Sequence, residues 1–150
     1  MEVCVCFCYN KKRITIQKYQ NSNTIKTREG KNMETMQGKK NIVLIGMPGA
    51  GKSTVGVVLA KRLGYRFLDS DLVIQEQTKK LLHELITEHG VDGFLKIEED
   101  INAGLDCEQA VIATGGSVIY GEKAMEHLRK IGCVVSVSYT HLRAHETLRH

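Results

Sequence analysis

Short apolar runs alternate with longer amphipathic segments through the middle of the chain. The apolar runs have the length of buried strands and cover residues 41–45, 65–68, 110–114 and 133–137. The segments between them predict helices over residues 52–63, 71–77, 81–88, 91–105 and 121–130. Alternating strand and helix signals are typical of a parallel sheet that helices cover on both faces. The sequence therefore predicts an α/β fold over residues 39–137.

The two ends of the chain lack this pattern. Residues 10–32 are polar, with many Asn, Lys, Thr and Gln and little apolar periodicity. We expect residues 1–38 to be a disordered or mistranslated leader, with the true start at Met33 or Met36. Residues 138–150 break the preceding pattern abruptly and resemble translated adapter read-through, so we expect a non-native tail there.

The charge of the chain is concentrated in these ends. Residues 1–38 carry a net +4 and residues 138–150 a net +1, whereas the middle holds twelve Lys/Arg against thirteen Asp/Glu. A near-neutral domain offers no basic surface for nucleic acid, and no apolar run is long enough for a signal or a membrane span. Cys107 and Cys133 suggest no disulfide framework, so we expect a reducing cytoplasm.

The strand at 41–45 leads into the sequence G-M-P-G-A-G-K-S, a complete Walker A loop at residues 46–53. Glycines in such a loop let backbone N–H groups turn onto phosphate oxygens. The lysine can reach the β- and γ-phosphates, and the serine hydroxyl can ligate Mg²⁺. We therefore predict a nucleotide site at Gly49, Ala50, Gly51, Lys52, Ser53 and Thr54.

A pair of aspartates, Asp69 and Asp71, follows the second strand. In a parallel sheet, ligands bind beyond the carboxyl ends of the strands, so both fall near the Walker loop. One carboxylate can hold the Mg²⁺ shell, usually through water, and the other can orient or deprotonate an attacking hydroxyl. The alternative is a helix N-cap, for which Asp is an ordinary residue.

Two glycines, Gly115 and Gly116, follow the third strand at the same predicted edge. Paired glycines allow backbone N–H groups to face a bound substrate. The alternative is a plain turn from strand to helix.

Together these residues resemble the shikimate kinases, small P-loop kinases that phosphorylate a hydroxyl of shikimate with MgATP. The matching elements are G-M-P-G-A-G-K-S-T at 46–54, L-D-S-D at 68–71, residues 90–99 against G-E-x-x-F-R-x-x-E-x, and residues 113–117 against A-T-G-G-G. The resemblance covers about residues 40–137. It implies a three-layer P-loop NTPase fold like that of the nucleoside-monophosphate kinases, with ATP and Mg²⁺ as cofactors.

The resemblance also implies a role for each matching residue. Lys52 would bind the β- and γ-phosphates, Ser53 would ligate Mg²⁺, and Asp69 would support the ion through water. Asp71 would bind the substrate hydroxyl and act as the base. Gly115 and Gly116 would offer backbone contacts to the substrate.

Three departures from the family pattern bear on activity. Leu95 stands where the family has the arginine that binds the substrate carboxylate, and the adjacent Lys96 points about 100° away on a helix. Ser117 replaces the last glycine of the turn. The lid with its arginine, and the last strand, are expected beyond Val137 and have no counterpart in the sequence.

We therefore expect a monomeric, cytoplasmic enzyme of aromatic amino acid biosynthesis that phosphorylates a small-molecule hydroxyl, with shikimate as the first candidate. Neither nucleic acid nor a membrane is an expected partner. The alternatives are a related P-loop kinase for another polyol or sugar acid, and a non-catalytic nucleotide-binding fragment. Because of the three departures, we expect the chain itself to turn over shikimate poorly or not at all.

Overall fold

Four parallel strands form the centre of the structure. The computed structural model describes residues 4–10, 13–20, 23–24 and 41–137. In spatial order the central strands are β7 (Gly132–Val137), β4 (Asn41–Ile45), β6 (Ala110–Ala113) and β5 (Arg66–Asp69). Each pairs in parallel with its neighbour, as the alternating strand and helix signals predicted.

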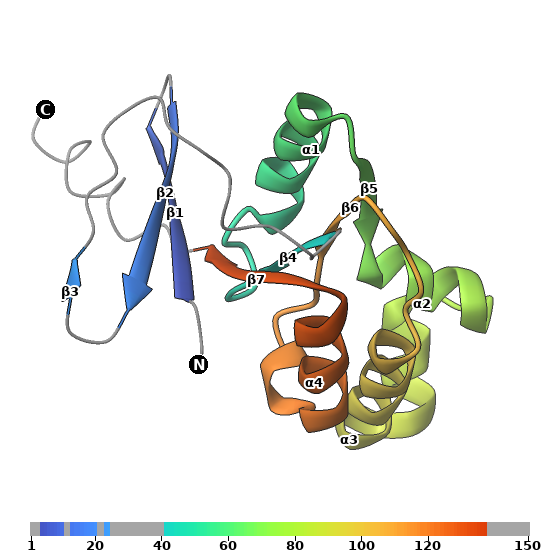
Figure 1. Cartoon of the computed structure of the whole chain (residues 1–150). Coiled ribbons are helices and arrows are strands. Elements are labelled where there is room, and N and C mark those ends of the chain that lie inside the picture. The colour runs from blue at the N-terminus through green and yellow to red at the C-terminus, as the bar shows by residue number, and fades with distance from the viewer. Residues whose placement is uncertain (1–3, 11–12, 21–22, 25–40, 138–150) are drawn as a thin grey trace, which may run out of the picture.

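Helices cover both faces of these strands, which gives the predicted three layers (Figure 1). Helix α1 (Lys52–Leu63) lies on one face, and α3 (Leu82–Ala103) and α4 (Glu122–Ile131) lie on the other. Helix α2 (Ser70–Thr78) follows β5 directly, and a single 3₁₀ turn, η2 (Val118–Tyr120), precedes α4.

The alternation of side chains along β4 explains why both faces are apolar. Ile42 and Leu44 pack into the cluster below α1, whereas Val43 packs into the cluster that α4 covers. All three are at most 4% exposed. Burial on both faces is the reason that the strand reads as a continuous apolar run rather than as an alternating one.

Three further strands extend the sheet beyond β7. Strand β1 (Cys4–Asn10) pairs in parallel with β7, and β2 (Arg13–Gln20) and β3 (Asn23–Thr24) continue in antiparallel pairing. We expected no folded element before residue 39, so these strands differ from the sequence-based expectation. The division at residues 38 and 137 stays a prediction, and the proposed starts and the tail at 138–150 lie outside the described residues.

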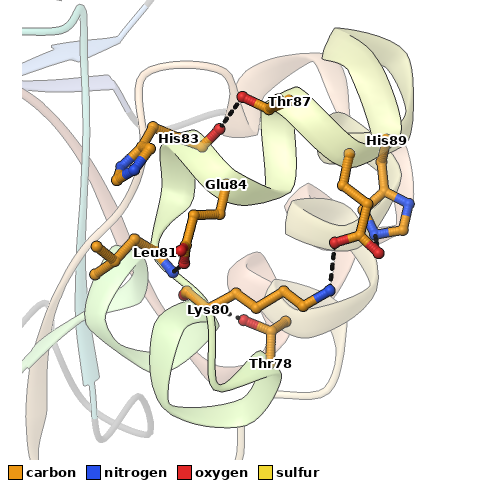
Figure 2. Close-up of polar contacts among 8 residues, drawn as sticks. Thr78, Lys80, Leu81, His83, Glu84, Thr87 and His89 are labelled. Atoms are coloured by element: carbon orange, nitrogen blue, oxygen red, sulfur yellow. Dashed lines mark hydrogen bonds and ion pairs between the residues drawn. The ribbon is translucent and has the colours of Figure 1, made fainter.

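Helix α3 changes direction at Gly90. This residue has φ 71° and ψ 177°, which is not helical, so the two helices predicted on either side of it are both present. Figure 2 shows the turn between α2 and the first part of α3, where Lys80 pairs with Glu88 across the turn. The backbone N–H of Leu81 donates to the Glu84 carboxylate at 2.7 Å, which fixes the start of α3.

None of the helices in the described ranges has both the length and the apolar character that crossing a membrane would require.

The buried side chain of Asn41 connects three segments at the amino end of the sheet. Its amide nitrogen donates to the carbonyl of Cys107 at 2.7 Å and to that of Ile131 at 2.9 Å. Its oxygen accepts from the backbone N–H of Ala110 at 3.0 Å. Because the side chain is 2% exposed, water cannot replace these bonds without a rearrangement.

Asn41→Ala should therefore lower the free energy of unfolding by about 3 kcal/mol, because it removes three hydrogen bonds of a buried side chain. Urea unfolding followed by circular dichroism measures the change. Glu126→Ala is the matched control, since it breaks an exposed ion pair with Lys130 and should change the stability far less. Equal effects of the two substitutions would contradict this account of Asn41.

Candidate active site

The Walker loop joins β4 to α1 in the predicted geometry. Gly49 and Gly51 have φ angles of 76° and 80°, in the left-handed region that glycine tolerates best. Gly51 is the residue before α1, so the first N–H groups of the helix point toward the loop. Ser53 and Thr54 are exposed and Ala50 is buried. The loop is therefore shaped to hold phosphate oxygens on backbone N–H groups.

The Lys52 side chain folds back over this loop. Its ammonium group donates to the carbonyls of Gly46 at 2.7 Å and Met47 at 2.9 Å. Burial lowers the pKa of Lys52, and the carboxylates of Asp71 and Asp69 act in the opposite direction. The Lys52 ammonium group, which we expect to bind a phosphate, thus lies within the electric field of the Asp69 and Asp71 carboxylates.

The Asp69 carboxylate joins the loop to the end of β5. One of its oxygens accepts a hydrogen bond from the Ser53 hydroxyl at 3.0 Å. The other accepts from the backbone N–H of Asp71 at 3.0 Å and caps α2. Asp69 therefore caps α2 with one oxygen, and this role is compatible with the proposed role of its carboxylate at a metal ion. A hydroxyl and a carboxylate on two elements are an oxygen ligand set that suits Mg²⁺.

The second aspartate, Asp71, lies in the first turn of α2 and is partly buried. Burial raises the pKa of its carboxyl, and the neighbouring Asp69 raises it further, whereas Lys52 lowers it. A higher pKa makes a carboxylate a better proton acceptor, and perturbed acids of this kind gather at active sites.

The glycine turn after β6 packs directly on the Walker loop. A Cβ atom at Gly116 would lie 2.6 Å from the Pro48 ring, so only glycine allows this approach. A Cβ atom at Gly115 would lie 2.1 Å from Glu98 Oε1 and 3.3 Å from Asp71 Oδ1. The structure therefore brings the three predicted features, the loop, the aspartates and the glycines, to one edge of the sheet.

Ser70 takes part in this site, although no pattern of residues pointed to it. Its side chain is fully buried, and its hydroxyl accepts a hydrogen bond from the Gly115 N–H at 3.2 Å. The Gly115 carbonyl accepts from Val118 N at 3.4 Å. Both backbone groups of Gly115 are thus engaged within the protein, so in this geometry Gly116 is the better placed of the two for a substrate contact.

Glu98 and Ser117 form a second pair that residue types alone could not reveal. Glu98, on α3, is 2% exposed, and its carboxylate accepts a hydrogen bond from the Ser117 hydroxyl. Burial raises the pKa of Glu98, the Ser117 hydrogen bond lowers it, and Asp71 raises it. A buried acid is thus in contact with the glycine turn.

Two cavities border the turn. A hollow of about 680 Å³ lies between the Walker loop, η2 and the end of β7, and its lining includes Pro48, Gly116, Ser117 and Val137. A smaller cavity of about 100 Å³ lies between α3 and η2, and Leu95, Lys96, Glu98 and Ser117 line it. The larger volume is of the size that small-molecule sites have.

The family model for shikimate kinase matches residues 48–149, more than half of the chain. The chain belongs to the shikimate kinase family. Curated shikimate kinases agree: that of Nostoc sp. is 41% identical over 71% of this chain and 62% of its own length. That of Clostridium botulinum is 43% identical over 66% of this chain and 60% of its own length.

Solved shikimate kinases share the fold. The enzyme from Acinetobacter baumannii, solved in complex with shikimate, has a TM-score of 0.64 and 36% identity over 75% of this chain and 64% of its own. The enzyme from Aquifex aeolicus has a TM-score of 0.60 and 31% identity over 65% of this chain and 63% of its own. The predicted family and the P-loop kinase fold are confirmed.

The chain spans about 60% of the length of the curated shikimate kinases it matches. The family match also runs past Val137, the residue at which we expected the kinase sequence to end.

The buried carboxyl of Glu98 should make the stability of the protein depend on pH. Because the pKa of Glu98 is raised in the folded state, wild-type protein should lose stability relative to Glu98→Gln as the pH rises from about 4.3 through the raised value. The amide keeps the shape and a hydrogen bond to Ser117 without the buried charge. Urea midpoints measured from pH 4 to pH 8 give the difference.

Glu126→Gln is the control for this titration. Glu126 is exposed, and its hydrogen bond with Lys130 lowers its pKa, so the carboxylate stabilises the fold above its unfolded pKa and loses that effect as the pH falls. The control should therefore show the opposite sign and a small amplitude. A Glu98→Gln difference that does not change with pH would contradict the assignment.

Proposed function

We propose that this protein transfers the γ-phosphoryl group of ATP to a hydroxyl of a small molecule, with shikimate as the first candidate acceptor. The observation that carries the proposal is the meeting of Asp69, Asp71 and the Walker loop, in which Asp69 binds Ser53 at 3.0 Å. The relatives named shikimate kinase support shikimate as the acceptor. We propose that the reaction belongs to aromatic amino acid biosynthesis. We further propose that the protein works as a cytoplasmic monomer.

In this reaction the acceptor oxygen forms a bond to the γ-phosphorus, and the bond between that phosphorus and the bridging oxygen breaks, so ADP leaves. Asp71 accepts the proton of the attacking hydroxyl. Lys52 exchanges the carbonyls of Gly46 and Met47 for phosphate oxygens and neutralises their charge.

Ser53 and Asp69 would hold Mg²⁺, which supplies positive charge to the phosphates when it is bound. Their chemistry fits this ion, because both offer oxygen atoms and the carboxylate already lies within hydrogen-bond distance of the hydroxyl. The backbone N–H groups of the loop, from Gly49 onward, would hold the phosphates in place.

Asp71→Asn should lower the rate of phosphoryl transfer by about 10²- to 10⁴-fold, because it removes the proton acceptor. ATP binding should stay within about threefold, since Asp71 lies beside the acceptor rather than on the loop. Transfer of labelled γ-phosphate to shikimate measures the first quantity, and calorimetric titration with MgATP measures the second. An unchanged rate in the variant would remove Asp71 from the mechanism.

Lys52→Met is the matched comparison, because it should weaken MgATP binding as well as the transfer. Leu95 favours a second candidate function, a kinase for another polyol or sugar acid, so quinate, gluconate and glycerol belong in the acceptor panel. A protein that binds MgATP and phosphorylates none of these compounds would instead be a non-catalytic nucleotide-binding protein.

A further inference from the structure

Three successive side chains at the start of α2 reach three different parts of the site. Asp69 binds the Ser53 hydroxyl at 3.0 Å, and Asp71 Oδ1 lies 3.3 Å from the position that a Cβ at Gly115 would take. Ser70 lies between the two aspartates, is fully buried, and accepts a hydrogen bond from the Gly115 N–H at 3.2 Å. The proposed phosphoryl transfer uses both aspartates and gives this buried hydroxyl no role.

The register of the sheet brings Ser70 to the glycine turn. Strands β5 and β6 are parallel, and Asp69 at the end of β5 pairs with Ala113 at the end of β6. Beyond this pair the chain continues into α2 on one side and into the turn that holds Gly115 on the other. The hydrogen bond between Ser70 and Gly115 therefore joins the two segments directly after the paired strand ends.

The turn is held from two sides where it leaves β6. The hydroxyl and the backbone N–H of Thr114 both donate to the carbonyl of Leu44, at 2.9 and 3.1 Å. This pair of bonds fixes the turn to β4, the strand that enters the Walker loop. The next residue, Gly115, is fixed to α2 through Ser70. Ser70 thus provides the support of the turn on the side of the two aspartates.

The bonds of Gly115 also determine the direction of the next peptide group. Its carbonyl accepts from the Val118 N–H at 3.4 Å, while its own N–H donates to Ser70. Because the peptide that follows is planar, the N–H of Gly116 points away from this carbonyl. Gly116 lines the larger cavity beside Pro48 of the Walker loop. Its N–H therefore has a fixed direction at the place where, in the proposed reaction, the acceptor and the nucleotide meet.

Loss of the Ser70 hydroxyl should displace this turn. A buried backbone N–H needs a hydrogen-bond partner, and the carboxylates of Asp71 and Glu98 also lie close to Gly115. Without Ser70 the turn would relax toward one of these carboxylates, and Gly116 would move relative to the Walker loop. A misplacement of about 1 Å between reacting groups can reduce a rate by about 10²-fold.

We propose that Ser70 is a positioning residue, whose hydroxyl holds the turn at Gly115 and Gly116 against the Walker loop and thereby sets the place of the acceptor relative to the γ-phosphate. The inference rests on the proposed phosphoryl transfer and adds a residue that acts on it through Gly115. The simpler alternative is that a small side chain only fills a tight helix start.

Ser70→Ala separates these two roles, because alanine keeps the small size and removes the hydroxyl. It should lower kcat for the transfer of labelled phosphate from ATP to shikimate by about ten- to a hundredfold. The Kd of MgATP, measured by calorimetry, should stay within about twofold, since Asp69 rather than Ser70 contacts the Walker loop. Ser70→Thr keeps the hydroxyl and should retain at least about a third of the wild-type kcat.

Asn41→Ala is the matched control for a loss of stability. It removes the hydrogen bonds of a buried side chain at the opposite, amino end of the sheet. All variants are assayed at a temperature at which circular dichroism shows them to be folded. Under these conditions Asn41→Ala should leave kcat within about twofold of the wild-type value, because it does not reach the glycine turn.

A second measurement does not depend on turnover. Amide hydrogen exchange followed by NMR should show that Ser70→Ala raises the exchange rate of Gly115 by at least about tenfold relative to that of Ile112 in β6. Ser70→Thr should change this ratio by less than about threefold.

An unchanged kcat in Ser70→Ala, an equal loss of kcat in Asn41→Ala, or an unchanged exchange ratio in Ser70→Ala would each overturn the inference. If the wild-type protein phosphorylates no acceptor, the proposed function fails, and the exchange ratio alone decides whether Ser70 holds the turn.

Discussion

The Asp69 carboxylate holds together the two parts of the site. One oxygen binds the Ser53 hydroxyl at the start of α1, and the other binds the first turn of α2. A carboxylate at a helix N-terminus is stabilised by the exposed N–H groups and by the helix dipole. The donor of this second bond is the backbone N–H of Asp71, two residues further along, whose carboxyl lies within the field of Lys52. The position of the proposed base and the position of the proposed metal ligand are therefore set by one side chain.

This arrangement was predictable to the extent that it follows from local sequence. The glycines and lysine of the Walker loop are contiguous, and the β4 run that precedes them is apolar throughout, so the strand, the loop and the helix could be placed. The parallel order then brings Asp69 to the same edge, because the carboxyl ends of parallel strands point one way.

Contacts between segments that are distant in the chain could not be predicted from the sequence in this way. The hydrogen bond from Gly115 to Ser70 spans 45 positions, and a buried serine between two aspartates looks like an ordinary N-terminal turn of a helix. Strand β1 is similar, because its parallel pairing with β7 depends on which edge is available rather than on its own periodicity. Sequence patterns indicate burial and local geometry, but they do not identify which distant residue or strand a given segment will contact.

The two substitutions at Leu95 and Ser117 have a common physical consequence through Glu98. A carboxylate that is 2% exposed needs a partner, since its desolvation is not repaid otherwise. Leucine cannot supply a charge from the preceding turn of α3, whereas the Ser117 hydroxyl supplies a hydrogen bond from the opposite wall. A glycine at position 117 would leave the acid without that bond. The serine thus gives the buried acid a partner that Leu95 cannot, and the same bond fixes the direction of a hydroxyl that lines both cavities.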